Sequence, residues 1–373
     1  MENKDRALMN VPRDIILLLI FLLSSLAGVF ATGVQPSQPE APTRTIVDAR
    51  GRSVSITANP ERIVIAGSAT LMVADAFYVF ESAAGRVVGI TRIGQARGNF
   101  LPEIDDAYDE KVVLERNVGP EQIAALSPDV VILKSFMKER LGDGVEQLGI
   151  PVIYVDFETP ENYGRDLAIL GSILQEPARA DQIARYYADA VDAVTARTAA
   201  IPADQRPDVL FLYASPTGAE TAFNIPPESW IQTTLVELAG GQPVWTESNP
   251  GSGWLTVGLE QIAAWDPDKI VLVAYRDNPE EIRAALLQQG IWQSLKAVQT
   301  GEFHVFPVDF YSWDQPDTRW ALGLQWLATK IQPELFNDIN MTQVVYGFFE
   351  LLYGMDRATT DELILNELGG DLD

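Results

Sequence analysis

One eighteen-residue segment occurs twice in this chain in nearly the same form, and no other feature of the sequence constrains the fold as much. VGPEQIAALSPDVVILKS fills residues 118–135 and VGLEQIAAWDPDKIVLVA fills residues 257–274, with ten identical positions in a gap-free alignment. Each copy predicts a helix that begins after its Gly, a Pro-Asp turn and an apolar strand. Two copies of such a unit, 139 positions apart, predict two structurally equivalent halves.

The segments around each copy predict an α/β lobe of the same kind. Short apolar runs such as RIVIAGS and PVIYVDF alternate with amphipathic stretches, which favours parallel sheets covered by helices on both faces. We expect a first lobe at residues 44–158, opened by a small β-hairpin, and a second at 201–373 with terminal helices packed on it. Residues 159–200 predict a long helix, or a bent pair of helices, that bridges the lobes.

The N-terminal residues predict an export signal. An apolar run from Ile15 to Ala31 follows a short charged segment, and Val29 and Ala31 are small residues suited to a cleavage point. We expect residues 1–31 to be a signal peptide that is removed, and 32–43 to be a Pro-rich tether. An uncleaved membrane anchor is the alternative. The sequence has no Cys, so it is not a lipoprotein, and we expect it in the periplasm or on the extracellular face of the cytoplasmic membrane.

Composition excludes several classes of function. The 27 Lys and Arg stand against 52 Asp and Glu, and a net charge of -25 repels nucleic acid. With no Cys and with His304 as the single His, we expect no metal site, no cofactor and no catalytic residues. A secreted α/β-hydrolase-like enzyme is the alternative from another class, because Gly67 and Ser68 between a strand and a helix resemble a nucleophile elbow that would need His304 as its base. An adhesion module without a small ligand is a third possibility.

Four segments carry a family resemblance. They are ERIVIAGSATLMVADAF at 61–77, the two copies of VGxEQIAAxxPDxxxL, GIPVIYVDFETPENYGRDLAILGSIL at 149–174 and FYSWDQPDTRWALGLQWLATKIQPELF at 310–336. In this order and spacing they resemble the substrate-binding proteins of ABC importers whose lobes are bridged by a long helix, the type III periplasmic binding proteins. The resemblance covers nearly all of residues 44–353, and it implies a monomer with a ligand cleft between its lobes.

The resemblance also implies a docking role for Glu121 and Glu260, which occupy matching positions in the two copies. In the family, one glutamate on each lobe pairs with arginines of the two permease subunits. A pseudo-symmetric protein with two equivalent acidic residues suits a two-fold symmetric partner. The structural alternative is that a Glu in a first helical turn is stabilised by the helix dipole and needs no partner.

The carboxyl ends of the expected strands supply the candidate ligand-binding residues, because open α/β sheets bind ligands there. These residues are Ser68, Arg92, Arg97, Lys134, Tyr213, Tyr275, Arg276, Tyr311 and Trp313, and Trp254 is added from a Gly-rich loop just before an expected helix. Cations beside flat aromatic side chains suit an oxygen-rich metal chelate. We therefore expect the cargo to be an iron–siderophore type of complex. Molybdate or tungstate, cobalamin and haem are the alternatives within the same fold.

Overall fold

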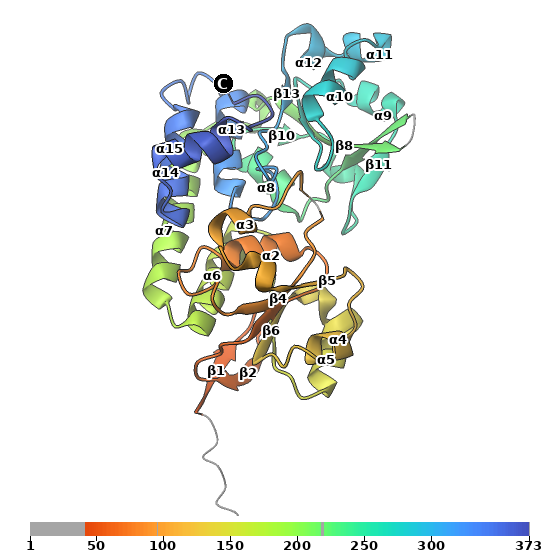
Figure 1. Ribbon diagram of the computed structural model, residues 1–373. Helices are drawn as coiled ribbons and strands as arrows, with labels where there is room; N and C mark the ends of the chain where they lie inside the picture. The colour runs from red at the N-terminus through yellow and green to blue at the C-terminus, as the bar shows by residue number, and fades with distance from the viewer. Residues whose placement is uncertain (1–41, 95, 218–219, 373) are drawn as a thin grey trace, which may run out of the picture. The chain divides into compact units, whose positions relative to one another are not determined.

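The computed structural model describes residues 42–372, apart from 95, 218 and 219. The expected signal peptide and all but the end of the expected tether lie outside the described residues. The first described element is an antiparallel hairpin of β1 (Thr43–Val47) and β2 (Ser53–Thr57), as the alternating sequence predicted. Two larger sheets follow within the unit formed by residues 43–373 (Figure 1). Across the described ranges, no helix combines the length and the apolar character that a bilayer span requires.

The first large sheet has five parallel strands in the order β5-β4-β3-β6-β7. It forms the first lobe, which we take as residues 44–158. Strands β3, β6 and β7 are buried along their whole length, which explains why their sequences are continuously apolar rather than alternating. The strands are β3 (Ile63–Ile65), β4 (Val87–Thr91), β5 (Val112–Leu114), β6 (Val130–Lys134) and β7 (Val152–Val155).

The second large sheet, in the second lobe at residues 201–372, is mixed, whereas the sequence predicted a parallel one. Strand β12 is parallel to β8 and β13, and β10 is parallel to the start of β8. Strand β9 runs antiparallel to β8, because the connection between them is too short for the crossover that a parallel pair needs, and β11 runs antiparallel to β9. The strands are β8 (Asp208–Thr217), β9 (Glu220–Ile225), β10 (Gln242–Pro243), β11 (Leu255–Val257), β12 (Lys269–Val273) and β13 (Phe303–Val305).

Both copies of the repeat adopt the same local structure. Helix α4 (Pro120–Ala124) leads into β6, and helix α9 (Leu259–Trp265) leads into β12. The turn between helix and strand contains Ser127 in one copy and Asp266 in the other, at equivalent positions, and both have a positive φ, of 47° and 39°. Left-handed backbone is unusual outside Gly, so its occurrence at the same place in both copies supports a common structural unit.

The Asp of the Pro-Asp turn has the same contact in each lobe. Asp129 Oδ2 accepts hydrogen bonds from the backbone N–H groups of Glu61 and Arg62, just before β3. Asp268 Oδ2 accepts one from the N–H of Asp208, the first residue of β8. Each aspartate therefore ties its copy of the repeat to the neighbouring central strand. This contact explains why the Pro-Asp pair is retained while the strand residues after it differ.

The bridge between the lobes is a bent pair of helices. Helix α6 (Pro160–Leu174) begins after Thr159, whose hydroxyl accepts from the Asn162 N–H, and it ends at Gln175 with a φ of 63°. Helix α7 (Pro177–Thr198) starts at once with a Pro in its first turn. Helix α6 contacts α2 and β1 of the first lobe, whereas α7 contacts α8 and α13 of the second. Each helix of the bridge therefore belongs mainly to one lobe.

The remaining helices cover the sheets. In the first lobe they are α2 (Thr70–Phe77), α3 (Leu101–Ile104), α5 (Asp143–Gln147), the π-turn η3 (Lys138–Gly142) and the 3₁₀ turns η1 (Tyr108–Glu110) and η2 (Ser135–Met137). In the second lobe they are α8 (Ile231–Leu238), α10 (Pro279–Leu286), α11 (Gly290–Gln293), α12 (Lys296–Gln299), α13 (Trp320–Ile331), α14 (Met341–Tyr353), α15 (Arg357–Thr360), η4 (Ala203–Gln205), η5 (Thr246–Ser248) and η6 (Asp361–Leu365).

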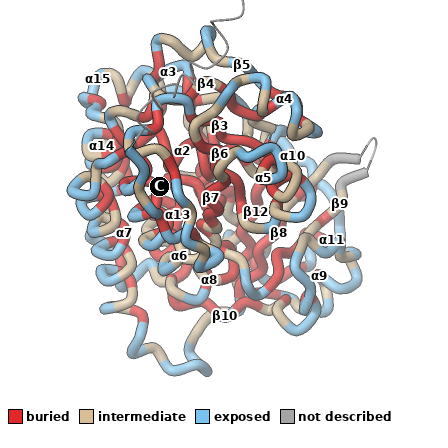
Figure 2. The backbone as a smooth tube through the Cα atoms, turned by 90° about the horizontal axis from the view of Figure 1, so that it is seen from below, coloured by how far each residue is buried: buried red, intermediate tan, exposed pale blue. Residues whose placement is uncertain are grey.

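The C-terminal helices pack where the sequence predicted. Helix α13 contacts α8 of the second lobe and α7 of the bridge, and α14 contacts α13. Figure 2 shows the buried residues concentrated in the central strands, with exposed residues on the outer sides of the helices. Strands β6 and β12, which end the two copies of the repeat, are buried at every position.

Candidate functional site

A pocket of about 240 Å³ lies between the lobes and is lined by both. The first lobe contributes Ser68, Ala69, Met72, Phe136 and Glu158. The second contributes Trp230, Gln232, Trp254, Tyr275, Gln315 and Pro316. Of the residues predicted from the sequence, Ser68, Trp254 and Tyr275 line it. The prediction placed ligand mainly at strand ends, and Ser68 and Tyr275 follow the carboxyl ends of β3 and β12, whereas Trp254 directly precedes β11.

Aromatic rings form the wall of the pocket on the second lobe. Trp230 and Trp254 meet edge to face, with ring centroids 5.4 Å apart and planes at 86°. Tyr213, which was predicted as a ligand residue, stands behind this wall, with its ring centroid 5.2 Å from Trp254 and 4.6 Å from Tyr275. Edge-to-face and tilted contacts of this kind hold the rings in place, so the wall is a preformed apolar surface that presents both ring faces and ring edges.

Behind the wall lies a buried carboxylate, Asp314, surrounded by donors. It accepts hydrogen bonds from Tyr275 Oη at 2.8 Å, from Gln232 Nε2 at 3.1 Å and from Ser312 Oγ at 2.5 Å. Burial raises the pKa of Asp314 to about 6, although these three donors lower it. Burial also raises the pKa of Tyr275 well above its usual value, so this phenol stays protonated and donates.

An ion pair with a buried cation and a partly exposed carboxylate stands at the edge of the pocket on the first lobe. Lys134 at the end of β6, predicted as a ligand residue, is 1% exposed, and its Nζ lies 2.6 Å from Glu158 Oε1. The same ammonium also donates to the backbone oxygen of Asp156. Lys134 is therefore paired with groups of the protein itself. The charged residue of this pair that lines the pocket is Glu158. The sequence prediction placed the cation of this pair in the cleft, whereas the structure places the anion there.

The predicted arginines lie outside the pocket lining. Arg92 and Arg116 border a small recess that shares Ser68 and Ala69 with the pocket, and Arg92 Nη2 lies 3.1 Å from Glu115 Oε1. Arg276 is exposed and donates from Nε to the backbone oxygen of Gly94 at 2.9 Å, which links the two lobes.

Arg97 is also exposed and has its backbone N–H bonded to the oxygen of Phe310. Its guanidinium lies beside Gly369 near the C-terminus, away from the pocket lining. The sequence could not place these loop side chains, because nothing in a loop sequence fixes which way a long side chain turns.

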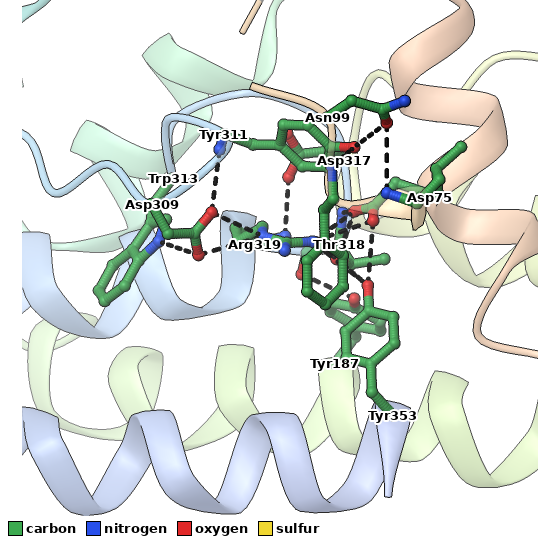
Figure 3. Close-up of polar contacts among 12 residues, drawn as sticks. Asp75, Asn99, Tyr187, Asp309, Tyr311, Trp313, Asp317, Thr318, Arg319 and Tyr353 are labelled. Carbon is green, nitrogen blue, oxygen red and sulfur yellow. Dashed lines mark hydrogen bonds and ion pairs between the residues drawn. The ribbon is translucent and has the colours of Figure 1, made fainter. Parts of the chain in front are cut away.

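Tyr311 and Trp313 were predicted to contact ligand, but the structure places both outside the pocket lining. Both are completely buried and neither lines the pocket. Tyr311 Oη accepts from the Phe100 N–H at 3.0 Å, and Trp313 Nε1 donates to Asp309 Oδ2 at 3.2 Å. They belong to a buried polar cluster at the lobe junction, which Figure 3 shows around Arg319. After β13 the chain turns inward, so these rings pack instead of facing the cleft.

Several lining residues were missed by the sequence prediction, among them Trp230, Gln232 and Gln315. Trp230 and Gln232 stand at the start of α8, and a search limited to strand ends does not include helix starts. The signal was present, because WIQTT follows a Pro-rich loop at the end of β9 and opens a helix toward the cleft. Gln315 follows the SWD segment, and the prediction selected the Trp of that segment instead of Gln315.

The two repeat glutamates have matching geometry. Glu121 and Glu260 are exposed in the first turns of α4 and α9. In each case the carboxylate folds back toward the preceding glycine, since a Cβ built on Gly119 would lie 3.4 Å from Glu121 Oε2 and one on Gly258 would lie 3.1 Å from Glu260 Oε2. Two equivalent lobes therefore present an exposed carboxylate in the same way.

The groups required by the hydrolase alternative are not brought together. His304 lies on β13, with its Nε2 3.0 Å from Glu302 Oε2, and it does not line the pocket that contains Ser68. Burial lowers the pKa of His304. Within residues 42–372 and their stated gaps, no three His, Cys, Asp or Glu side chains are grouped in a way that could hold a metal ion.

Comparisons with known proteins agree with this architecture. Residues 89–309 match the family model described as periplasmic binding protein. A molybdate-binding protein of Haemophilus influenzae is 23% identical over 83% of this chain and 91% of its own length. An ABC transporter substrate-binding lipoprotein of Bacillus subtilis is 24% identical over 79% of this chain and 87% of its own length.

Among solved structures, a periplasmic solute-binding protein from Veillonella parvula superposes with a TM-score of 0.71 at 23% identity. The match covers 87% of this chain and 97% of that one. At this identity the likeness concerns the fold, and it extends over both lobes and the bridge.

Proposed function

The chain belongs to the periplasmic binding protein family, and on that premise we propose that it is the substrate-binding component of an ABC importer whose cargo is a chelated metal with a flat apolar face. Membership in a family of binding proteins also removes the hydrolase alternative. The export signal expected at residues 1–31 agrees with a function outside the cytoplasm.

The composition of the pocket lining carries the proposal for the cargo. Trp230, Trp254 and Tyr275 offer ring faces and edges, and Phe136 and Met72 add apolar surface from the opposite lobe. Among the described residues, the lining contains no Lys or Arg, and Glu158 is its one charged residue. A bare oxoanion needs positive charge or several N–H donors, and it would be repelled by a carboxylate at this edge. A chelate that hides its metal inside an organic shell suits the aromatic wall better.

Molybdate or tungstate is the second candidate, and two observations favour it. The Haemophilus influenzae relative is named for molybdate, and the arginine recess beside Ser68 places Arg92 and Arg116 close to the pocket. An oxoanion would therefore sit in the recess, away from the aromatic wall. This difference in position allows the two candidates to be separated.

Delivery would use the two repeat carboxylates. Glu121 and Glu260 are exposed on separate lobes in matching conformations, and a permease made of two equivalent subunits would offer two matching cationic sites. The cargo would bind between the lobes and pass to the permease when both glutamates are engaged.

Titration with a defined panel tests the cargo. The purified protein would be titrated with ferric catecholate and hydroxamate siderophores, haem, cyanocobalamin, molybdate and tungstate, followed by calorimetry and native mass spectrometry. We expect submicromolar binding of a chelate, and a loss of at least about tenfold in affinity on Trp254→Ala. Binding of molybdate that is lost on Arg92→Ala with Arg116→Ala, and retained by Trp254→Ala, would select the second candidate instead.

A further inference from the structure

The amide of Gln232 is a buried polar group at the pocket. The residue lines the pocket but is only 4% exposed, and its Nε2 donates to Asp314 Oδ2 at 3.1 Å. Its Oε1 is buried and accepts no hydrogen bond from the described residues. A buried carbonyl without a donor is costly, so this oxygen is the atom of Gln232 that a ligand can satisfy.

Asp314 determines which end of the Gln232 amide lacks a hydrogen-bond partner. An ionised carboxylate can only accept hydrogen bonds, so the NH₂ end of Gln232 must face it and the carbonyl end must face away. Tyr275 and Ser312 donate to the same carboxylate, which fixes its position from two further directions. The amide of Gln232 is therefore not free to rotate by 180° and offer its NH₂ group to the pocket.

We propose that Asp314 is a positioning residue that holds Gln232 with its amide oxygen toward the cargo, so that the pocket selects ligands with a hydrogen-bond donor at this point. The inference rests on the proposed function and names the chemistry of the ligand periphery. Glu158 adds a second acceptor from the opposite lobe. The favoured cargo carries N–H or O–H groups, such as amides, amines or hydroxyls, beside a flat apolar face. An acceptor-only anion leaves Gln232 Oε1 unsatisfied.

A matched pair of fragments tests the donor requirement. Benzamide and acetophenone have nearly the same shape, and both have a ring for the aromatic wall and a carbonyl, but only benzamide has N–H donors. Their affinities would be measured from chemical-shift titrations of the Trp indole N–H signals, assigned with Trp230→Phe and Trp254→Phe, which locates binding in the pocket. We expect wild-type protein to prefer benzamide by about tenfold, the effect of one hydrogen bond to a buried acceptor.

Two variants test the role of Asp314. Asp314→Leu removes the group that orients the amide, and Gln232→Met removes the amide itself at nearly constant shape. In both, the benzamide preference should fall to within about twofold, because no oriented acceptor remains. Glu237→Gln, on the exposed side of the same helix, should keep the full preference. A ratio of two affinities is insensitive to a general loss of stability.

The inference is overturned if wild-type protein shows no benzamide preference in the pocket, if neither fragment binds there, or if both variants keep the preference. These outcomes differ from failure of the proposed function, which the chelate panel tests. Chelate binding without a benzamide preference would remove the role of Asp314 alone. A benzamide preference without chelate binding would keep the acceptor site and remove the metal chelate as cargo.

Discussion

Arg319 Nη1 lies 2.9 Å from both carboxylate oxygens of Asp75, and both side chains are completely buried. Asp75 lies on α2 in the first lobe, and Arg319 immediately precedes α13 in the second, so one ion pair joins residues 244 positions apart. Arg319 Nε lies 3.3 Å from Asp309 (Figure 3). The guanidinium carbon stands 4.5 Å from the ring centroid of Phe100. The acidic neighbours raise the pKa of Arg319, so it stays charged.

Replacing Arg319 with Met should destabilise the protein by about 3–5 kcal/mol, because Asp75 and Asp309 would remain buried without their cation. Urea unfolding measures this change. The matched control is Arg197→Met, which breaks the largely solvent-exposed pair with Asp338 and should have a much smaller effect. Arg319→Met with a free energy of unfolding close to that of Arg197→Met would show that the buried pair contributes little.

Ligand should close the lobes only slightly. Besides the Arg319–Asp75 pair, Tyr311 Oη of the second lobe accepts from the Phe100 N–H of the first, and Arg276 Nε donates to the Gly94 oxygen. A wide hinge motion would break these contacts and expose buried charges. We expect a change in radius of gyration of less than about 1 Å on cargo binding by small-angle scattering. A compaction of several ångströms would show that the junction opens freely.

The raised pKa of Asp314 gives stability a defined dependence on pH. Its folded pKa of about 6 exceeds the usual value of 3.8, so between these values the folded protein holds a proton that the unfolded chain releases. Stability contributed by this group is present below about pH 4 and is lost as the pH rises through 6, by about 3 kcal/mol in total.

Asp314→Asn tests this, because Asn does not titrate. From pH 4 to pH 7 the variant should lose about 2 kcal/mol less stability than the wild type, measured by urea unfolding at several pH values. Burial also raises the pKa of Asp166, so the wild-type slope contains other groups and the informative quantity is the difference between the two proteins. Parallel curves for both would show that Asp314 does not titrate in this range.

The repeat made the fold predictable, because it specifies local structure. Its Gly begins a helix, its Asp accepts hydrogen bonds from the neighbouring strand segment, and its apolar run forms a buried strand. All three features occur in both copies, after Gly119 and after Gly258. The mixed order of the second sheet could not be read in the same way. The sequence of a strand such as β9 does not specify whether its neighbour is parallel or antiparallel.

The site was only partly predictable, because it depends on contacts distant in sequence. Tyr275 was selected from its place after a strand and Trp254 from a Gly-rich loop, and both line the pocket, but Gln232 is bonded to Asp314, 82 positions later. Tyr311 was misplaced for the same reason, since its partner Phe100 lies 211 positions earlier. Residue type and position within an element predict which groups are near a strand end, whereas burial and pairing decide which of them face the ligand.

Charge reversal at the two repeat glutamates should separate docking from binding. With Glu121→Arg and Glu260→Arg together, we expect uptake by cells that carry the importer to fall by at least about tenfold, because two cation–carboxylate contacts become repulsive. Cargo affinity should remain unchanged, since neither residue lines the pocket. The control is Glu110→Lys with Glu334→Lys, which changes one exposed carboxylate on each lobe by the same charge outside the repeat.

Each single reversal should retain part of the uptake if the two lobes engage separate permease subunits, and the double variant should lose more than either. Equal loss in the control pair would assign the effect to net charge, which is already -25, and would contradict a specific contact. A parallel loss of cargo affinity in the Glu121 and Glu260 variants would place these carboxylates in the fold of the lobes, where the N-terminal turns of α4 and α9 need them for the helix dipole alone.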